Sequence, residues 1–288
     1  MSWLCRERTL GLGVRPLVMG ILNVTPDSFS DGGAYATFDR AVRHGLEMAD
    51  AGADLIDVGG ESTRPGAQVV SPEEEAGRVI PVLRALVRAF AGKAGGPALS
   101  VDTRKAEVAQ AAFEAGAHIL NDVTALEGDP AMVGVARDYG AGVILMHMQG
   151  EPATMQQAPH YTDVVAEVTA YLAGRVAALK AAGMKGAALA VDPGIGFGKT
   201  VEHNVKLMAG LPSLVALGQP VVVGVSRKSF ISKITGCGMA DRLAGSVAGA
   251  VWAAGQGAHI WRVHDVAESV QAARLVERLR EETVTWNG

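Results

Sequence analysis

The chain consists of eight similar units, each with a short apolar run, a polar end to that run and then an amphipathic segment. The runs are Leu17–Leu22, Asp54–Val58, Pro97–Val101, Ala117–Leu120, Val143–Met146, Ala187–Val191, Val221–Val225 and His259–Val263. Continuous apolar runs of this length predict strands that are buried on both faces of a parallel sheet. Most runs follow a glycine, which suits the left-handed residue that ends a helix. These glycines are Gly52, Gly116, Gly140, Gly183, Gly218 and Gly257.

Eight strand–helix units of about 35 residues each predict a TIM (β/α)8 barrel. We expect a single domain over residues 1–288, with a short N-terminal strand or hairpin that turns at Gly11 and Gly13. Helical spacing of apolar residues predicts the outer helices, and one of them begins at the capping box Ser71-Pro72-Glu73-Glu74. A doubly wound sheet is the alternative fold, but no G-x-G-x-x-G motif follows the first run.

Composition and charge narrow the class of protein. Hydrophobic residues make up 49% of the chain and charged residues 19%, which is enough apolar content for a large core. Every apolar run is shorter than the ~18 residues of a membrane span, and the first residues lack a signal-peptide core. The net charge is -4 and Lys and Arg are scattered, so we expect no nucleic-acid or membrane partner. Cys5 and Cys237 form neither a disulfide framework nor a zinc spacing, and we predict a cytoplasmic protein.

Polar side chains collect where the apolar runs end. In a barrel these ends meet on one face, which is where barrel enzymes place their active sites. A single Asp or Asn at a strand end commonly caps the next helix, but polar groups at all the ends are costly to bury without a polar ligand. The joint pattern therefore favours a site. The strand-end residues are Asn23, Asp57, Asp102, Asn121, His147, Asp192, Lys228, Arg262 and His264.

The first part of this set suits a flat heterocycle. Asp102, Asn121 and Asp192 offer acceptor oxygens and one amide, and Lys228 offers a donor. Such groups match the amino-oxo edge of a guanine or pterin ring.

The second part suits a pyrophosphate with Mg²⁺. Arg64, Arg262 and His264 offer donors, and Asn23 offers an oxygen ligand for the metal. An isolated histidine is more commonly structural, but Arg262 stands two residues before His264 and so on the same strand face, which favours an anion site.

Two other motifs predict less than they first suggest. The segment D-P-G-I-G-F-G-K-T looks like a phosphate loop, but the glycine needed five positions before Gly198 is Pro193, so it is not a Walker A motif. His147-Met148 has no second His or Cys at ligand spacing, so it predicts no metal set.

Several motifs, in order, resemble the dihydropteroate synthase family. They are M-G-I-L-N-V-T-P-D-S-F-S-D-G-G, D-V-G-G-E-S-T-R-P-G, S-V-D-T-R-K, N-D-V, M-H-M-Q-G-E-P-A-T-M-Q, D-P-G-I-G-F-G-K, S-R-K-S-F-I and R-V-H-D-V. The resemblance extends from about Leu10 to the last helix. It implies a barrel transferase of folate biosynthesis that condenses 6-hydroxymethyl-7,8-dihydropterin pyrophosphate with p-aminobenzoate, releases pyrophosphate, uses Mg²⁺ and is a sulfonamide target.

The resemblance also implies roles for individual residues. The pterin-binding residues would be Asp102, Asn121, Asp192 and Lys228. The pyrophosphate-binding residues would be Asn23, Thr63, Arg64, Arg262 and His264, with Asn23 on the metal. The p-aminobenzoate-binding residues would be Phe29, Thr63, Pro65 and Ser229. The loops Val24–Gly33 and Gly59–Gly66 would be mobile lids, and the catalytic residues would be Asp31, Lys228, Arg262 and His264.

Elementary chemistry agrees with this reaction. Pyrophosphate is a good leaving group when Mg²⁺ and Arg or His donors stabilise its developing charge. Its loss leaves a cation on the exocyclic methylene of the pterin, and Asp31 would stabilise that cation before the amine attacks, in an SN1-like order. No covalent nucleophile is needed, in agreement with the lack of an activated Ser or Cys.

Two alternatives and one assembly prediction remain. A methyltetrahydrofolate:corrinoid methyltransferase shares the ring-binding strand ends but would lack R-V-H and S-T-R-P, and both are present. A non-catalytic paralogue that binds pterin stays open. The segment Ala244–Ala254 is apolar nearly all round although it belongs to the outer helical ring, so we predict a homodimer interface there.

Overall fold

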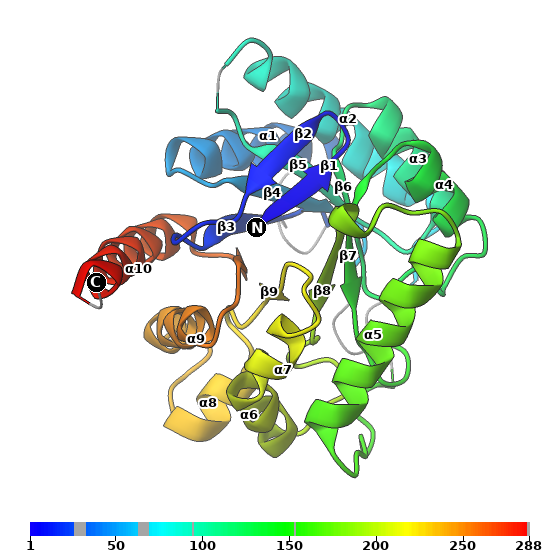
Figure 1. Ribbon diagram of the computed structural model, residues 1–288. Coiled ribbons are helices and arrows are strands. Elements are labelled where there is room, and N and C mark those ends of the chain that lie inside the picture. The colour runs from blue at the N-terminus through cyan, green and yellow to red at the C-terminus, as the bar shows by residue number, and fades with distance from the viewer. Residues whose placement is uncertain (26–32, 63–68, 94, 153, 287–288) are drawn as a thin grey trace.

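Eight parallel strands form a nearly closed barrel in the computed structural model, which describes residues 1–25, 33–62, 69–93, 95–152 and 154–286 (Figure 1). The side chains of residues 33–36 and 283–286 lie outside this description. The strands are β3 (Leu17–Asn23), β4 (Leu55–Gly59), β5 (Ala98–Asp102), β6 (Ile119–Asp122), β7 (Gly142–Met146), β8 (Leu189–Asp192), β9 (Val222–Val223) and β10 (Ile260–Val263). They pair in the order β8-β7-β6-β5-β4-β3-β10-β9, and a bridge from Val191 to Val221 joins the two ends. The predicted TIM-like barrel is confirmed, and the doubly wound alternative is wrong.

Helices cover the outside of the barrel (Figure 1). They are α1 (Gly33–Asp50), α2 (Pro72–Phe90), α3 (Ala106–Glu114), α4 (Met132–Asp138), α5 (Val164–Ala181), α6 (Val201–Ala209), α7 (Leu211–Val215), α8 (Ser229–Thr235), α9 (Leu243–Gly255) and α10 (Val266–Trp286), with a 3-10 turn, η2, at Gly186–Ala188. Ser71 caps α2 as predicted, because its hydroxyl accepts the Glu74 N–H at 3.2 Å. The Glu74 carboxylate pairs with Arg78 one turn later. Only the Ser71 half of the predicted capping box is therefore formed in the described part of the chain, without the return bond from Glu74 to the Ser71 backbone.

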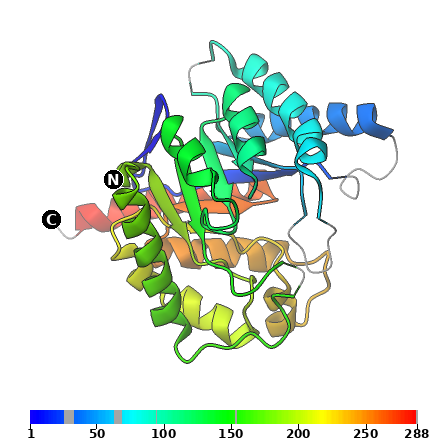
Figure 2. The ribbon, with the colours of Figure 1, turned by 90° about the vertical axis from the view of Figure 1, so that its right-hand side faces the viewer.

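An antiparallel hairpin, β1 (Ser2–Cys5) and β2 (Arg8–Gly11), covers the amino-terminal end of the barrel (Figures 1 and 2). Its turn lies at Arg6 and Glu7, so the prediction of a turn at Gly11 and Gly13 was wrong. Arg6 has a left-handed backbone with φ 58°, and its guanidinium donates to the carbonyls of Phe113 and Ala117 at 2.9 and 2.7 Å. These tertiary hydrogen bonds stabilise a turn that the local sequence does not predict.

The lower barrel interior is an apolar plug. Trp3 of the hairpin is fully buried there, and its indole Nε1 donates to the carbonyl of Ala188 at 2.9 Å. The strand residues packed with it are Leu17, Met19, Leu55, Ala98, Ile119, Ile144, Ala190, Val222 and Ile260. Because this end is filled with hydrocarbon, the polar interior is confined to the opposite, carboxyl end of the strands.

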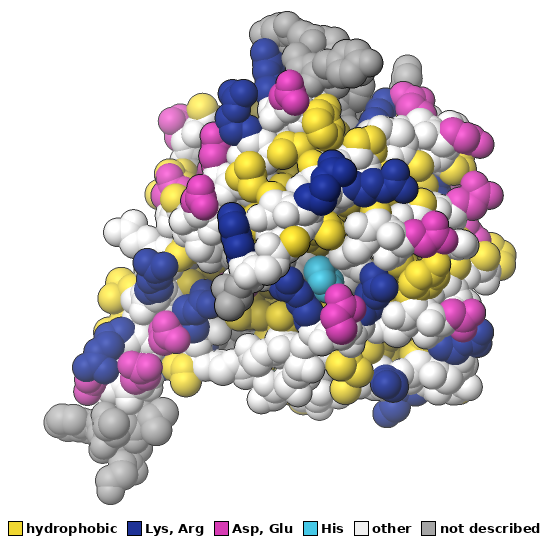
Figure 3. Space-filling model, turned by 90° about the horizontal axis from the view of Figure 1, so that it is seen from above, with side chains coloured by type: hydrophobic (Ala, Val, Ile, Leu, Met, Phe, Trp, Pro, Cys, Tyr) yellow, Lys and Arg dark blue, Asp and Glu magenta, His cyan; other side chains and the backbone are white. Residues whose placement is uncertain are grey.

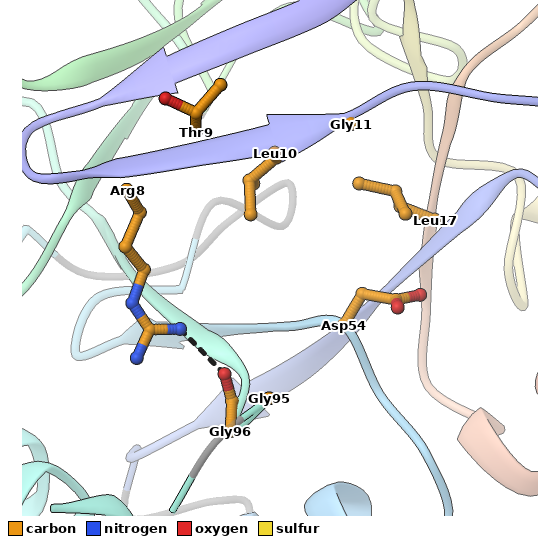
Figure 4. A pocket seen from close by; sticks show the side chains of 8 residues that line it. All are labelled: Arg8, Thr9, Leu10, Gly11, Leu17, Asp54, Gly95 and Gly96. Atoms are coloured by element: carbon orange, nitrogen blue, oxygen red, sulfur yellow. Dashed lines mark hydrogen bonds between the residues drawn. The ribbon is translucent and has the colours of Figure 1, made fainter. Parts of the chain in front are cut away.

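A groove of about 430 Å³ lies beside the hairpin (Figure 4). Arg8 reaches across it to the carbonyl of Gly96 at 2.6 Å, and the Asp54 carboxylate is held by Arg15 at 2.6 and 3.0 Å. The groove therefore lies at the end away from the polar strand ends, and these charged groups already have partners.

The surface agrees with the scattered charge of the sequence. The face seen from above in Figure 3 shows Lys and Arg interspersed with Asp and Glu, without a broad patch of one sign. Among the described helices, none is both long and apolar enough to cross a membrane.

Candidate active site

Strand register brings the predicted residues into one row at the carboxyl end of the barrel. Asn23 of β3 pairs with Gly59 of β4, Gly59 with Asp102 of β5, and Asp102 with Asn121 of β6. Gly59 leaves room in this row, since a Cβ there would lie 3.4 Å from the Cβ of Asp102 and 3.8 Å from Oδ1 of Asn23. Asn23 and Asp102 therefore border one open position, and Asn121 is next to Asp102 in the same row.

An ion-pair network joins this row to β10. Arg262 donates from Nε to Asp57 at 2.7 Å and from Nη2 to Asp102 at 2.6 Å. Asn121 Nδ2 donates to the same Asp57 oxygen at 2.9 Å. Asp57 is fully buried, and its other oxygen, Oδ1, has no hydrogen-bond partner in the described structure. A buried carboxylate oxygen without a partner is costly, so Asp57 is tolerated here because its other oxygen holds both Asn121 and Arg262.

Asp57 is a residue to which sequence reasoning assigned no role. It was recognised as a strand end, but its importance arises from Arg262, which lies 205 residues later. The structure also turns the Arg262 guanidinium toward the carboxylates, whereas the sequence suggested that Arg262 and His264 form one anion site.

Two carboxyl groups at this end, those of Asp102 and Asp192, are hard to ionise. Burial raises the pKa of Asp102 to about 7, the nearby charges of Asp57, Glu75 and Asp122 add to the rise, and Arg262 opposes it. Burial also raises the pKa of Asp192, against the opposing effects of the Gly194 N–H and of Lys228, Arg262 and Lys199. Near neutral pH the Asp102 carboxyl is therefore present in both protonation states, and it can accept or donate a hydrogen bond.

Asp192 and Lys228 lie against one glycine-rich loop, Gly194–Gly198. The Gly194 N–H donates to Oδ1 of Asp192 at 2.7 Å. The Lys228 ammonium lies 4.0 Å from the centre of the Phe197 ring. Lys228 is the N-cap residue of α8, and the exposed Ser229 is its first residue, so both project from the end of the β9 unit.

His264 is a neutral group in this structure. Burial lowers its pKa to about 3, helped by the charges of Arg227 and Arg262. Its backbone N–H donates to the hydroxyl of Ser226, and its Nδ1 lies 3.1 Å from the same oxygen. A neutral imidazole held in this way offers its second ring nitrogen to a ligand as a hydrogen-bonding group rather than as a cation.

Part of the predicted site lies outside the described residues. These positions are Phe29, Asp31, Thr63, Arg64 and Pro65. Ion pairs fix the chain just before residue 63. Glu61 pairs with Arg104 at 2.9 Å and with Lys105, which also contacts the buried Glu75.

Comparison with known proteins identifies the family. A family profile described as pterin binding enzyme matches residues 19–264. Dihydropteroate synthase of Escherichia coli K12 is 52% identical over 262 residues, which is 91% of each chain. The chain belongs to the dihydropteroate synthase family.

Solved structures of this family have the same fold. Xanthomonas albilineans dihydropteroate synthase with 4-aminobenzoic acid has a TM-score of 0.89 at 50% identity, covering 97% of this chain and 98% of that one. Yersinia pestis dihydropteroate synthase with a sulfonamide drug complex has a TM-score of 0.90 at 47% identity, covering 98% and 100%. The chain is thus a transferase with dihydropteroate synthase activity, of a folate-biosynthesis family that sulfonamides target. These matches favour the synthase interpretation over the corrinoid methyltransferase.

Proposed function

We propose that Asp102, Asn121, Asp192 and Lys228 bind the pterin ring of 6-hydroxymethyl-7,8-dihydropterin pyrophosphate, and that the buried Asp57 holds Asn121 and Arg262 in place. The observation that carries this assignment is the pairing of Asp102 with Asn121 at the carboxyl end of the barrel, where both are joined through Arg262 and the buried Asp57. The 2-amino-4-oxo edge of a pterin supplies N–H donors for carboxylates and an oxygen for an amide or ammonium group. The pKa of Asp102, raised to about 7, lets this carboxyl match a ring that both donates and accepts, and the pKa of Asp192 is raised by burial in the same direction.

Arg262 and His264, with Asn23, Thr63 and Arg64, would bind the diphosphate. Nη1 of Arg262 makes no hydrogen bond within the described part of the chain, so this nitrogen is available to an anion. Arg262 stays protonated, because Asp57 and Asp102 raise its pKa against the opposing effect of burial.

The residues present fit Mg²⁺ carried by the substrate. Asn23 offers one hard oxygen beside Gly59, and no group of three or more His, Cys, Asp or Glu suited to a metal occurs among the described residues. Mg²⁺ prefers few protein ligands when phosphate oxygens and waters complete its shell, so Asn23 would hold it. When bound, it would neutralise charge on the departing pyrophosphate.

We propose that p-aminobenzoate binds between the lid residues Phe29, Thr63 and Pro65 and the start of α8, where Ser229 would meet its carboxylate. The 4-aminobenzoic acid in the Xanthomonas albilineans structure supports this substrate class, and the sulfonamide in the Yersinia pestis structure supports its competitors. Pyrophosphate would leave first, Asp31 would stabilise the methylene cation, and the neutral amine would then attack it in an SN1-like order. Lys228, Arg262 and His264 would complete the catalytic set.

Pyrophosphate release tests the reaction and its order. Purified protein would be given dihydropterin pyrophosphate and Mg²⁺, with and without p-aminobenzoate, and both pyrophosphate and dihydropteroate would be measured. Dihydropteroate that forms only with p-aminobenzoate supports the assigned activity, and slow release of pyrophosphate without the amine supports the SN1-like order. Absence of product would contradict the assignment, and unchanged turnover in Asp31→Asn would contradict the role of Asp31.

We also propose that residues 1–288 act as one domain, in a homodimer through α9. Large apolar side chains are exposed on α9 and on its neighbour α10, as Leu243, Val251, Trp252, Leu275 and Leu279. A patch of this kind on two adjacent helices favours a partner surface. A cytoplasmic location stays our prediction; Cys5 and Cys237, both free thiols, agree with a reducing compartment.

A further inference from the structure

Lys199, in the segment that resembles a phosphate loop, points into the protein. It is only 3% exposed. Its Nζ donates to the carbonyl of Phe197 at 2.9 Å, and it lies 3.0 Å from Nδ1 and 3.3 Å from the carbonyl oxygen of His147. These partners are all uncharged, because burial, together with Lys199 itself, lowers the pKa of His147 to about 3. Burial lowers the pKa of Lys199 to about 7, against the opposing charge of Asp192, so the ammonium form is costly to bury and adds little to folding stability.

The backbone around Lys199 is shaped for close contact with the end of β7. Gly194 and Gly198 have φ values of +65° and +60°. A Cβ would lie 1.9 Å from the His147 carbonyl oxygen at Gly194, and 2.4 Å from that of Gln149 at Gly198. Only glycine fits where two backbones approach this closely. The Lys199 side chain spans the same junction, so it ties together two segments that already touch.

The tied loop supports two of the proposed pterin-binding residues. Gly194 donates its N–H to Asp192, and the Phe197 ring lies under the Lys228 ammonium. Lys228 also runs over Gly196, where a Cβ would lie 3.1 Å from its Cδ. Moving this loop by a fraction of an ångström would therefore shift the partners of Asp192 and Lys228 together.

We propose that Lys199 is a positioning residue for pterin binding, which fastens the Gly194–Gly198 loop to the end of β7 and so holds Asp192 and Lys228 in place. This inference rests on the proposed pterin site. It explains why a lysine that is costly to bury occupies this position. Residues that reduce stability are expected next to a functional site when they hold its binding residues in place.

The direct test is Lys199→Met, which keeps the length of the side chain and removes its donors. We expect the Kd for dihydropterin pyrophosphate, measured by calorimetry without p-aminobenzoate, to rise roughly tenfold. The KM for p-aminobenzoate should change much less. Lys206→Met, on the exposed side of α6, is the matched control and should bind like the wild type. A purely structural role would instead lower the melting temperature and leave the Kd of the folded protein unchanged, which would overturn the proposal.

A pair of His147 variants provides the second measurement, also if Lys199→Met does not fold. His147→Asn keeps an acceptor oxygen near the position of Nδ1, and His147→Leu removes it. We expect His147→Asn to bind pterin more tightly than His147→Leu, and Lys199→Met to add little further loss to His147→Leu, because both changes break one contact. Equal binding by the two His147 variants, or fully additive losses, would contradict the proposal.

Asp192→Asn separates failure of this inference from failure of the proposed site. If Asp192→Asn leaves pterin binding unchanged, the site itself is wrong, and the role of Lys199 is wrong with it. If Asp192→Asn weakens binding and Lys199→Met does not, only the role of Lys199 is wrong.

Discussion

Replacing Asp102 with Asn should make the protein more stable at neutral pH while weakening pterin binding. The folded protein raises the pKa of this carboxyl from 3.8 to about 7, mainly by burial. Above pH 7 the wild type therefore keeps an ionised group that folding disfavours, whereas the amide carries no charge. Since one pKa unit corresponds to ~1.4 kcal/mol, the gain in free energy of unfolding for Asp102→Asn should be ~4 kcal/mol near pH 8.

The sign and pH range follow from linkage. Between the unfolded and folded pKa values, the folded wild type binds more protons than the unfolded chain, so its stability falls as pH rises from about 4 to about 7. Asp102→Asn removes this dependence. The stability difference should grow from ~2 kcal/mol near pH 5 to ~4 kcal/mol near pH 8, and it should vanish below about pH 3.

Urea unfolding at several pH values measures this difference. We expect the Asn amide oxygen to replace the Asp102 oxygen that accepts the Arg262 Nη2 bond, and Arg262 keeps Asp57 as its partner, so the comparison should involve neither a cavity nor an unpaired guanidinium. Asp138→Asn, an exposed carboxylate on α4 with a side chain 65% exposed, is the control and should show little difference at any pH. A variant that is less stable than the wild type at pH 8, or a difference that does not change with pH, would refute the reasoning.

Three further predictions concern the plug, the assembly and the metal. Trp3→Ala should lower the free energy of unfolding by about 3–5 kcal/mol in denaturant titration, because the fully buried indole would leave a cavity; a loss below 1 kcal/mol would show that the hairpin is not needed to fill the barrel. Trp252→Glu combined with Leu279→Glu should convert a dimer to a monomer in sedimentation at micromolar concentration, and a wild type that is already monomeric would remove the proposed interface. Removing Mg²⁺ with a chelator should abolish turnover and leave the midpoint of thermal unfolding nearly unchanged, because no described cluster of acidic or His ligands depends on it; a large fall in that midpoint would point to a structural metal instead.

The barrel was predictable because its signal is local and repeated. Each strand is a short apolar run, and each run occurs close to the predicted position, since burial on both faces selects the same residues eight times. The seventh run is the exception. Val221–Val225 was expected as a strand, but only Val222–Val223 is one, at the seam that the Val191–Val221 bridge closes. Contacts across a seam depend on barrel closure, which the run itself does not encode.

The site was predictable as a set of positions but not as a set of contacts. Strand ends in register bring Asn23, Asp102 and Asn121 together, as the fold alone requires. The role of Asp57 depends on a guanidinium from the last strand, and the inward turn of Lys199 depends on the end of β7. Both are long-range pairings between charged or polar groups, and a sequence pattern gives the residue types without their partners.

The two ends of the barrel interior have opposite effects on stability. At the hairpin end, the fully buried Trp3 and the buried aliphatic side chains around it stabilise the fold without touching the proposed site. At the carboxyl end, Asp57, Asp102 and Asp192 lie in a low-dielectric site that raises the pKa of the last two and leaves one Asp57 oxygen without a partner in the described structure. Substitutions at the first end should therefore lower stability and spare pterin binding, whereas neutral substitutions of Asp102 or Asp192 should raise stability and weaken binding. The same eight strands carry both ends, and a barrel of this size buries enough apolar surface to offset the cost of the buried carboxylates, which a smaller core would offset less well.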